Sequence, residues 1–510
     1  MVIARQGRCT NFQKCHVAGA HEIHTVPVGS GFQCPVCEHE LEDVESKVRS
    51  KPNRLIPVAF ATALALALCV IAISQRWITP PLFGAASSDG DKNTILLLAG
   101  SNTIGDTLAP SLAEAFLRNQ GATNVRTLPG TKPDERIVQG VLPGDSFASS
   151  IKIAAHGSAT AFSALAANAC DIGMASRRIK PDEASKLASM GDLYSFGSEH
   201  VLGLDGIAVI VNGSNPASEL TVDQVKRIFT GEITDWSQVG SFHGAINLYA
   251  RNDNSGTYDT FKSLVLAGMP LAPSAHRFED SNALSDAVAG DRSGIGFIGL
   301  PFVHNAKALS VSDKGTGALQ PTRLTVATED YALSRRLYLY TPANPRNKYA
   351  RMFVQFALSM QGQDVVAANG FIAQNIVPES QTVSIGAPNE YRRLTRSAER
   401  LPLNFRFQAG EAIQDNKAQA DLDRVVALIA DQKAAGAKIM LFGFSDSIGS
   451  PEANQALSLD RAKAIQNQFI QRGITPTVVQ GFGADLPVAS NDSALGREKN
   501  RRVEIWIQQG

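Results

Sequence analysis

The sequence has no excess of charge of either sign. Its 510 residues contain 48 Lys plus Arg and 48 Asp plus Glu, so the formal net charge is zero. Basic residues do not gather into the kind of patch that a nucleic-acid backbone requires. Nucleic acid is therefore not expected as a partner, and the length indicates three or four domains.

Cysteine is scarce in most of the chain. There are six cysteines; four lie in the first 37 residues, Cys69 lies in an apolar run, and Cys170 stands alone in the long segment that follows. Proteins that rely on disulfides in an oxidising compartment pair their cysteines throughout. Disulfides are therefore not expected to hold the body of this protein together.

Signals for catalysis are also missing. Ser158 and Ser255 are possible nucleophiles with His156 as a base, but His156 lies only two residues before Ser158 and neither serine stands in a G-x-S-x-G turn. The body has no His and carboxylate cluster at the spacing of metal ligands. We therefore expect a protein that is not an enzyme.

The first segment, residues 1–45, carries the clustered cysteines. The sequence CPVC at residues 34–37 has the spacing of a zinc knuckle, in which two thiolates share one tetrahedral ion. A structural zinc ion is the expected cofactor, and a pair of disulfides or reduced thiols are the alternatives. The expected ligands are Cys9, Cys15, Cys34 and Cys37, with His16, His21, His24 and His39 as possible substitutes.

One long apolar run follows. Residues 55–74 (LIPVAFATALALALCVIAIS) contain no charge, and at 1.5 Å per residue they span roughly 30 Å, the thickness of a bilayer core. Lys and Arg precede the run and only Arg76 follows it closely, which predicts a cytoplasmic amino end. A retained transmembrane helix is expected; a cleaved signal peptide is the alternative.

The rest of the chain divides by composition. Residues 75–93 are rich in Pro, Gly, Ser and Asp and are expected to be a linker. Residues 94–380 are expected to form a large α/β domain, residues 381–400 a polar connector, and residues 401–510 a smaller α/β domain.

Four turns with the same sequence pattern occur in the large domain. In each, an apolar strand is followed by small and hydroxyl residues and in most cases by a helix: GSNT at 100–103, HGSAT at 156–160, DIGMASR at 171–177 and RNDNSGT at 251–257. Free amides at such turns bind anions, and Arg251 adds a planar fork of donors. One such turn is weak evidence, but four of them indicate a site for a tetrahedral oxyanion.

The order of these motifs gives a resemblance. Residues 94–378 resemble the phosphate-type periplasmic solute-binding proteins of ABC importers, in which similar motifs follow one another in the same order. The motifs here are GSNT, HGSAT, DIGMASR, LTVDQVKRIFTGEITDWSQVG, RNDNSGT, GIGFIG and YALSRRLYLY. The resemblance implies two α/β lobes joined by a hinge, which close over a phosphate ion.

The resemblance also implies a set of phosphate-binding residues, with Asp253 orienting Arg251. Ser176 departs from the family, because many members place there an aspartate that accepts the proton of phosphate; other branches share the Ser-Arg ending. The residues are Ser101, Thr103, Ile104, Ser158, Ser176, Arg251, Asp253, Ser255, Gly256 and Thr257.

The last domain contains an arginine in an apolar helical row. Arg461 stands among Leu457, Ile465 and Phe469, which by itself indicates a buried ion pair more than a ligand contact. The pattern F-S-D-x-x-G-x(4)-N-x-x-L-S-x-x-R-A, with N-R-R-V-E-I near the end, resembles the OmpA-like peptidoglycan-binding domain.

That resemblance implies binding to the diaminopimelate of a stem peptide. A carboxylate takes the ligand's ammonium group and a guanidinium takes its carboxylate. These roles fall on Asp446 and Arg461, with Asn454 and Arg501 in support. The family's usual His-Thr before the aspartate is Phe444-Ser445 here.

Together these expectations describe a single-pass protein of a bacterial inner membrane, with its bulk in the periplasm and its end on the cell wall. Two roles stay open: phosphate capture for an ABC permease, or an envelope scaffold or sensor without a transport role. A cytosolic zinc ribbon favours the second role, and a permease encoded nearby favours the first.

Overall fold

The computed structural model describes residues 5–8, 23–26, 33–34, 41–43, 93–253, 255–407, 416–430 and 436–509. The chain divides into two compact units, residues 1–79 and 80–510. In the first unit, β1 (Arg5–Arg8) pairs antiparallel with β2 (Ile23–Val26) and with β3 (Glu42–Asp43). Of the four cysteines expected to bind zinc, only Cys34 lies among the described residues, and it is buried.

Two other expectations for the amino end stay predictions. The described residues include no group of three or more His, Cys, Asp or Glu side chains that could hold a metal ion. Among those same residues no helix is both long and apolar enough to cross a membrane. The apolar run at residues 55–74 lies outside the described residues.

The large α/β domain has two lobes. Lobe 1 comprises residues 93–202 and 338–378, and lobe 2 comprises residues 206–333. The elements of lobe 1 before the crossover are β4 (Thr94–Gly100), α3 (Asn102–Gly105), α4 (Leu108–Asn119), β5 (Thr123–Pro129), β6 (Glu135–Val141), β7 (Ser149–Ala154), α5 (Ser158–Ala166), β8 (Ile172–Ala175) and α6 (Pro181–Lys186).

Lobe 2 and the return to lobe 1 complete the domain. Lobe 2 holds β10 (Glu219–Thr221), α7 (Val222–Phe229), β11 (Asn247–Arg251), α8 (Gly256–Phe261), β12 (His276–Phe278), α9 (Ser281–Gly290), β13 (Gly294–Gly299), β14 (Lys307–Ala308), β15 (Ser310–Ser312) and α10 (Arg323–Ala327). Lobe 1 then gains α11 (Lys348–Leu358) and α12 (Met360–Ala368).

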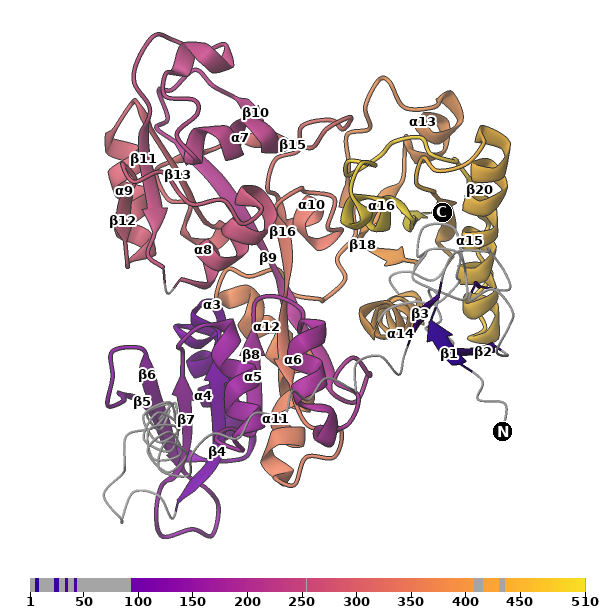
Figure 1. The fold of residues 1–510 in the computed structure, drawn as a ribbon. Helices are drawn as coiled ribbons and strands as arrows, with labels where there is room; N and C mark the ends of the chain where they lie inside the picture. The colour runs from indigo at the N-terminus through magenta and orange to yellow at the C-terminus, as the bar shows by residue number, and fades with distance from the viewer. Residues whose placement is uncertain are drawn as a thin grey trace. The chain divides into compact units, whose positions relative to one another are not determined.

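Two long strands connect the lobes. β9 (Glu199–Val211) and β16 (Ser334–Tyr340) pair antiparallel and run from one lobe into the other (Figure 1). The strand order is β12-β11-β13-β9-β16-β8-β4-β7-β6-β5, so β9 and β16 stand between the sheets of the two lobes. We call β9 and β16 the hinge strands, because bending them moves one lobe relative to the other.

Each lobe has its own apolar core. In lobe 1, Leu96 and Leu98, which share one face of β4, are fully buried. Phe116 of α4 packs edge-on against Phe353 of α11, with their ring centroids 5.5 Å apart. In lobe 2, the rings of Phe261 and Phe297 stack at 3.8 Å. Separate cores allow the lobes to move as rigid bodies about the hinge strands.

The carboxy-terminal domain forms a separate sheet in the order β17-β18-β21-β19-β20. Its elements are β17 (Glu379–Ser380), α13 (Asn389–Thr395), β18 (Glu399–Arg406), α14 (Asn416–Ala430), β19 (Lys438–Gly443), α15 (Pro451–Gln471), β20 (Val478–Gly481), α16 (Ala494–Asn500) and β21 (Arg502–Gln508).

The polar segment at residues 381–400 differs from the connector that we expected. It contains α13, and Tyr391 of this helix is buried against Phe442, Phe482 and Trp506. The Tyr391 hydroxyl donates to the Glu504 carboxylate at 2.6 Å. The segment is therefore part of the carboxy-terminal domain.

A buried histidine on the first hinge strand predicts acid sensitivity. Burial lowers the pKa of His200 from 6.5 to about 4. Between these values the unfolded chain binds a proton that the folded chain does not, so stability is lost as the pH falls. At about 1.4 kcal/mol per pKa unit, the free energy of unfolding should fall by up to about 3 kcal/mol.

Chemical denaturation at pH 7, 5.5 and 4.5 measures this loss. His200→Gln keeps a side-chain partner for Thr341 and does not titrate, so its stability should decrease less over the same interval. Equal losses in the wild type and in His200→Gln would contradict the prediction.

Candidate functional site

A cavity of about 370 Å³ lies between the two lobes. Lobe 1 contributes Thr103 of α3, and lobe 2 contributes Arg251 at the end of β11 and residues 255–257 at the start of α8. Asp205 of β9 lines the same cavity. Two of the four predicted turns, at residues 100–103 and 251–257, therefore come together around this cavity, which we call the cleft. Ser176, from a third turn, lines a different cavity.

Hydroxyl groups from lobe 1 surround Gly256 of lobe 2. A Cβ atom on Gly256 would lie 2.7 Å from Thr103 Oγ1, 3.2 Å from Ser176 Oγ and 3.4 Å from Ser101 Oγ. Only a glycine allows the two lobes to approach so closely at this position. The lobes are thus in contact beside the cleft, in a closed arrangement.

The serines of this group differ in their bonding. Ser158 Oγ accepts a hydrogen bond from the Ser176 amide at 3.0 Å and lies 3.1 Å from Ser176 Oγ. The Ser101 side chain is fully buried, and its hydroxyl has no hydrogen-bond partner among the residues that the structure describes. A buried hydroxyl without a partner is costly, so Ser101 Oγ is free to bind a ligand with polar atoms.

Arg335 of β16 occupies the centre of the closed arrangement. Its Nε and Nη2 donate to Asp205 Oδ2 at 2.9 and 2.5 Å, and both side chains are at most 4% exposed. The two residues are direct neighbours across the hinge strands. This buried ion pair therefore lies where the chain crosses between the lobes.

The same guanidinium contacts both lobes. On lobe 2, Nη1 donates to Gly256 O at 2.7 Å and to Thr260 Oγ1 at 2.6 Å. Nη2 also lies 3.3 Å from Thr103 Oγ1 on lobe 1 and 3.4 Å from Thr257 Oγ1 on lobe 2. Arg335 thus positions the hydroxyls on both sides of the cleft.

Asp205 and Arg335 were not among the residues predicted from the sequence. A signal for them exists: each is a charged residue inside an apolar strand, in LDGIAVIV and LSRRLYLY. Asp205 is 1% exposed, and no described residue forms a hydrogen bond with its Oδ1 atom. The cleft therefore presents one buried carboxylate oxygen that needs a donor.

Arg251 lines the cleft as expected, but its partners differ from those predicted. Its guanidinium donates to Glu279 O at 2.6 Å, to Phe278 O at 3.4 Å and to the Ser281 hydroxyl. Burial lowers the pKa of Arg251. Backbone oxygens of the last residue of β12 and of the residue after it hold this arginine in place.

The prediction that Asp253 orients Arg251 is wrong. The Asp253 side chain is 82% exposed and pairs with Arg277. Arg277 in turn lies over the ring of Tyr258, 4.3 Å from its centroid. The turn after β11 therefore directs the Asp253 carboxylate away from Arg251.

The remaining predicted residues lie at helix starts. Ile104 is in the first turn of α3, with its side chain in the core. Ser255 caps α8, because its hydroxyl accepts the Thr257 amide at 3.2 Å. First-turn amides have no partner inside a helix, so, apart from the Thr257 amide that Ser255 caps, the starts of α3 and α8 supply donors near the cleft.

A second group of predicted residues meets in the carboxy-terminal domain. Asp446 Oδ2 accepts from Arg501 Nη1 at 2.9 Å, and its Oδ1 accepts the Ile448 amide at 3.0 Å. The ion pair of this site is therefore Asp446–Arg501. Asn454 of α15 is also buried.

Arg461 is the less satisfied arginine of this group. Its Nη1 lies 3.4 Å from Phe444 O, and its buried Nε atom has no hydrogen-bond partner in the described part of the chain. Burial and the nearby Arg501 charge lower the pKa of Arg461 to about 10, although Asp446 opposes them. A buried guanidinium in this state favours an anionic group such as a carboxylate.

Two stretches of the chain match known protein families. Residues 87–361 match the PBP superfamily domain, which is more than half of the chain. The chain belongs to the PBP superfamily. Residues 406–501 match the OmpA family. The expected two-lobed fold and the OmpA-like carboxy-terminal domain are confirmed.

Relatives narrow the PBP assignment. A phosphate-binding protein PstS from Staphylococcus aureus (strain bovine RF122 / ET3-1) is 33% identical over 226 residues, which are 42% of this chain and 67% of the relative. PstS from Staphylococcus epidermidis (strain ATCC 35984) is 31% identical over 226 residues, 42% of this chain and 68% of the relative. The PBP domain is therefore PstS-like, and the chain is a binding protein rather than an enzyme.

Solved structures include an ABC-type phosphate transport receptor from Vibrio cholerae. It is 23% identical with a TM-score of 0.43, and the match covers 54% of this chain and 99% of the receptor.

The buried pair at the hinge gives a prediction for stability. Asp205→Asn leaves the Arg335 charge unpaired, so it should lower the free energy of unfolding by about 3 kcal/mol. Arg335→Met should have a similar effect, and the double variant should lose much less than the sum. Denaturant unfolding measures all three.

The exposed pair Asp253–Arg277 provides the matched control. Asp253→Asn and Arg277→Met should each change stability by less than about 1 kcal/mol, because exposed ion pairs contribute little. Additive losses at Asp205 and Arg335 would contradict the pairing.

Proposed function

We propose that the PstS-like domain captures inorganic phosphate in its cleft and passes it to an ABC permease. The observation that carries this proposal is the unpartnered, fully buried Ser101 hydroxyl among the groups that surround Gly256. Hydroxyls and first-turn amides supply donors to a tetrahedral oxyanion, and Arg251 and Arg335 supply positive charge. Sequence similarity to phosphate-binding proteins supports phosphate as the ligand.

Asp205 supports phosphate over sulfate. Hydrogen phosphate carries one hydroxyl donor at neutral pH, whereas sulfate carries none. The buried Asp205 Oδ1 atom has no partner in the structure, so a ligand that donates to it relieves the cost and a ligand without a donor does not. Asp205 thereby performs the task that an aspartate at the position of Ser176 performs in other members of the family.

Titration of the purified full chain with phosphate and with sulfate tests this function. The wild type should bind phosphate saturably and sulfate much more weakly. Gly256→Val should weaken phosphate binding at least about 100-fold, because the added carbons collide with Thr103 Oγ1. Arg251→Ala should weaken it at least about tenfold, since a charge-assisted hydrogen bond contributes about 1.5–3 kcal/mol.

Gly290→Val is the matched control, because a Cβ atom at Gly290 meets nothing within 4 Å. It should bind phosphate like the wild type. Absence of saturable phosphate binding by the wild type would overturn the proposal, and so would unchanged binding by both Gly256→Val and Arg251→Ala.

The OmpA-family domain is proposed to bind the diaminopimelate end of a peptidoglycan stem peptide. A free amino-acid end is a zwitterion, so it needs a carboxylate for its ammonium group and a guanidinium for its carboxylate. Asp446 and Arg461 provide these two groups, and Arg501 holds Asp446 in position. The wall would then hold the carboxy-terminal end of the protein.

Co-sedimentation with purified sacculi tests this assignment. Asp446→Ala and Arg461→Ala should each reduce the pelleted fraction at least about tenfold, because each leaves one charge of the zwitterion without a partner. Arg472→Ala is the control, because Arg472 is the exposed residue that caps the carboxyl end of α15, the helix of Arg461; it should pellet like the wild type. Undiminished pelleting of both site variants would count against the site.

Two further parts of the proposal, a membrane anchor and a zinc site, rest on the sequence alone. Residues 55–74 would hold the chain in the inner membrane, with residues 1–45 in the cytoplasm and the PstS-like and OmpA domains in the periplasm. Cys9, Cys15, Cys34 and Cys37 would bind one structural zinc ion.

A further inference from the structure

The carboxy-terminal domain contacts lobe 2 through buried charges. Arg400 Nη2 lies 2.8 Å from Asp330 Oδ2, and these side chains are 3% and 4% exposed. The Asn404 side-chain amide donates to Thr328 O at 2.8 Å and to Asp330 Oδ1 at 2.9 Å. β18 is therefore bound to lobe 2 by a buried ion pair and two side-chain hydrogen bonds, all of which are lost if the two surfaces separate.

Further contacts from this domain reach lobe 2 close to the second hinge strand. Arg406 Nη2 donates to Thr328 O at 2.7 Å, and Lys499 Nζ lies 3.4 Å from Ala332 O. Ala332 lies two residues before Ser334, where β16 begins. The domain is thus fixed to lobe 2 beside the strand that carries Arg335.

The same domain contacts lobe 1 through one helix start. The side-chain amide of Asn416, the first residue of α14, donates to Tyr194 O at 2.8 Å and to Glu199 Oε1 at 3.2 Å. Glu199 is buried and is held by Arg178 at 2.8 Å. Among the described residues this contact holds two hydrogen bonds but no ion pair between the carboxy-terminal domain and lobe 1, so it is the weaker of the two.

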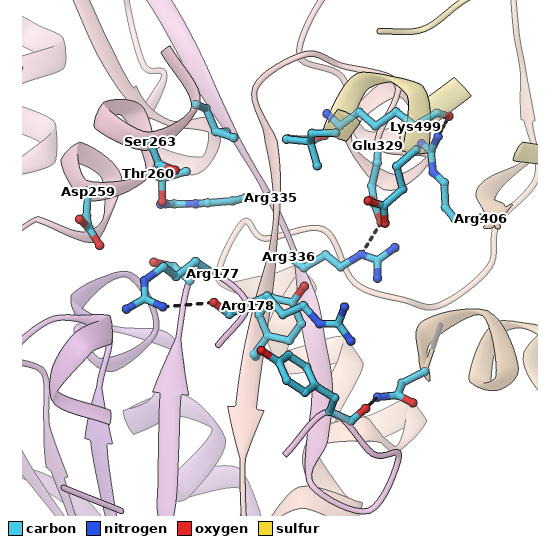
Figure 2. Close-up of a pocket in the computed structure, with 18 of the residues that line it drawn as sticks. Arg177, Arg178, Asp259, Thr260, Ser263, Glu329, Arg335, Arg336, Arg406 and Lys499 are labelled. Atoms are coloured by element: carbon cyan, nitrogen blue, oxygen red, sulfur yellow. Dashed lines mark hydrogen bonds and ion pairs between the residues drawn. The ribbon is translucent and has the colours of Figure 1, made fainter. Parts of the chain in front are cut away.

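A cavity of about 540 Å³ lies between the two lobes and the carboxy-terminal domain, beside the hinge strand β16 (Figure 2). Figure 2 shows Arg177 and Arg178 of lobe 1 facing it, with Thr260 and Ser263 of lobe 2 and Lys499 of the carboxy-terminal domain around it. Open space at this position lets the lobes rotate without first displacing packed side chains. Rotation is therefore resisted chiefly by the contacts at the edges of the cavity.

The two lobes are closed over the cleft in this structure. Lobes 1 and 2 meet at Gly256 and Thr103, so an ion held there is released only when the lobes separate. Because the carboxy-terminal domain contacts both lobes, separation must break one set of its contacts. Lobe 2 is bound through the Arg400–Asp330 ion pair and the hydrogen bonds of Asn404 and Arg406, whereas lobe 1 is bound through the hydrogen bonds of Asn416. Opening therefore breaks the contact with lobe 1.

We propose that the carboxy-terminal domain stabilises the closed form of the PstS-like domain through Asn416 and so slows the release of phosphate. This regulation rests on the proposed function of the cleft. A contact present only in the closed form raises ligand affinity by its own free energy, and ligand binding strengthens the contact by the same factor.

The test compares phosphate binding by the full chain and by Asn416→Ala. The variant loses two hydrogen bonds of the closed form, so the Kd for phosphate should rise about 5- to 150-fold, mainly through faster dissociation. Asn375→Ala is the matched control, because its side chain donates to Asp364 at 3.1 Å within lobe 1. Its Kd should equal that of the wild type.

Hydrogen exchange provides the reciprocal measurement. Phosphate should slow amide exchange in α14 of the wild type and leave it unchanged in Asn416→Ala. Normal pelleting of Asn416→Ala with sacculi shows that the OmpA-family domain is still folded in this variant.

The outcomes separate the two proposals. If the wild type binds phosphate and Asn416→Ala has the same Kd, dissociation rate and exchange response, the coupling is overturned and the proposed function stands. If the wild type does not bind phosphate, the proposed function is overturned, and the coupling with it.

Discussion

The buried ion pair between Asp205 and Arg335 is the interaction on which the cleft depends. It joins the two hinge strands at their crossing point, and the Arg335 guanidinium also reaches hydroxyls or carbonyls of both lobes. A buried guanidinium is tolerated only with a charged partner and several acceptors. The geometry that satisfies Arg335 therefore also sets the distance between the lobes.

Beside this pair the cleft contains two buried polar groups, a hydroxyl and a carboxylate oxygen, that need hydrogen-bond partners. Ser101 Oγ is fully buried without a partner, and Asp205 Oδ1 is a buried acceptor without a donor. Native proteins rarely leave such atoms unsatisfied unless a ligand or water binds them. A small ligand that both accepts and donates hydrogen bonds fits this combination, and hydrogen phosphate is such a ligand.

The sequence predicted the local parts of the site and missed those that depend on strand orientation. Ser101, Thr103 and Gly256 were predictable because a strand, a small-residue turn and a helix start follow one another in the chain. Arg335 was not, because adjacent strand residues point to opposite faces and LSRRLYLY does not say which arginine faces the cleft. Arg336 pairs with Glu329 instead.

Two other differences have similar causes. Asp253 lies two residues from Arg251 in sequence, but the turn after β11 directs its carboxylate to Arg277 on the neighbouring strand β12. The segment at residues 381–400 is polar in composition, and a single buried tyrosine, Tyr391, places it in the carboxy-terminal domain. Neither contact is encoded by the spacing or composition of the segment itself.

Binding of phosphate in the cleft is best tested by a crystal structure of the protein grown with phosphate. We expect a tetrahedral ion within hydrogen-bond distance of Ser101 Oγ, Thr103 Oγ1 and Asp205 Oδ1, with the Asp205–Arg335 pair intact. A cleft filled only by side chains, or an ion bound elsewhere with Ser101 Oγ still unpartnered, would contradict it.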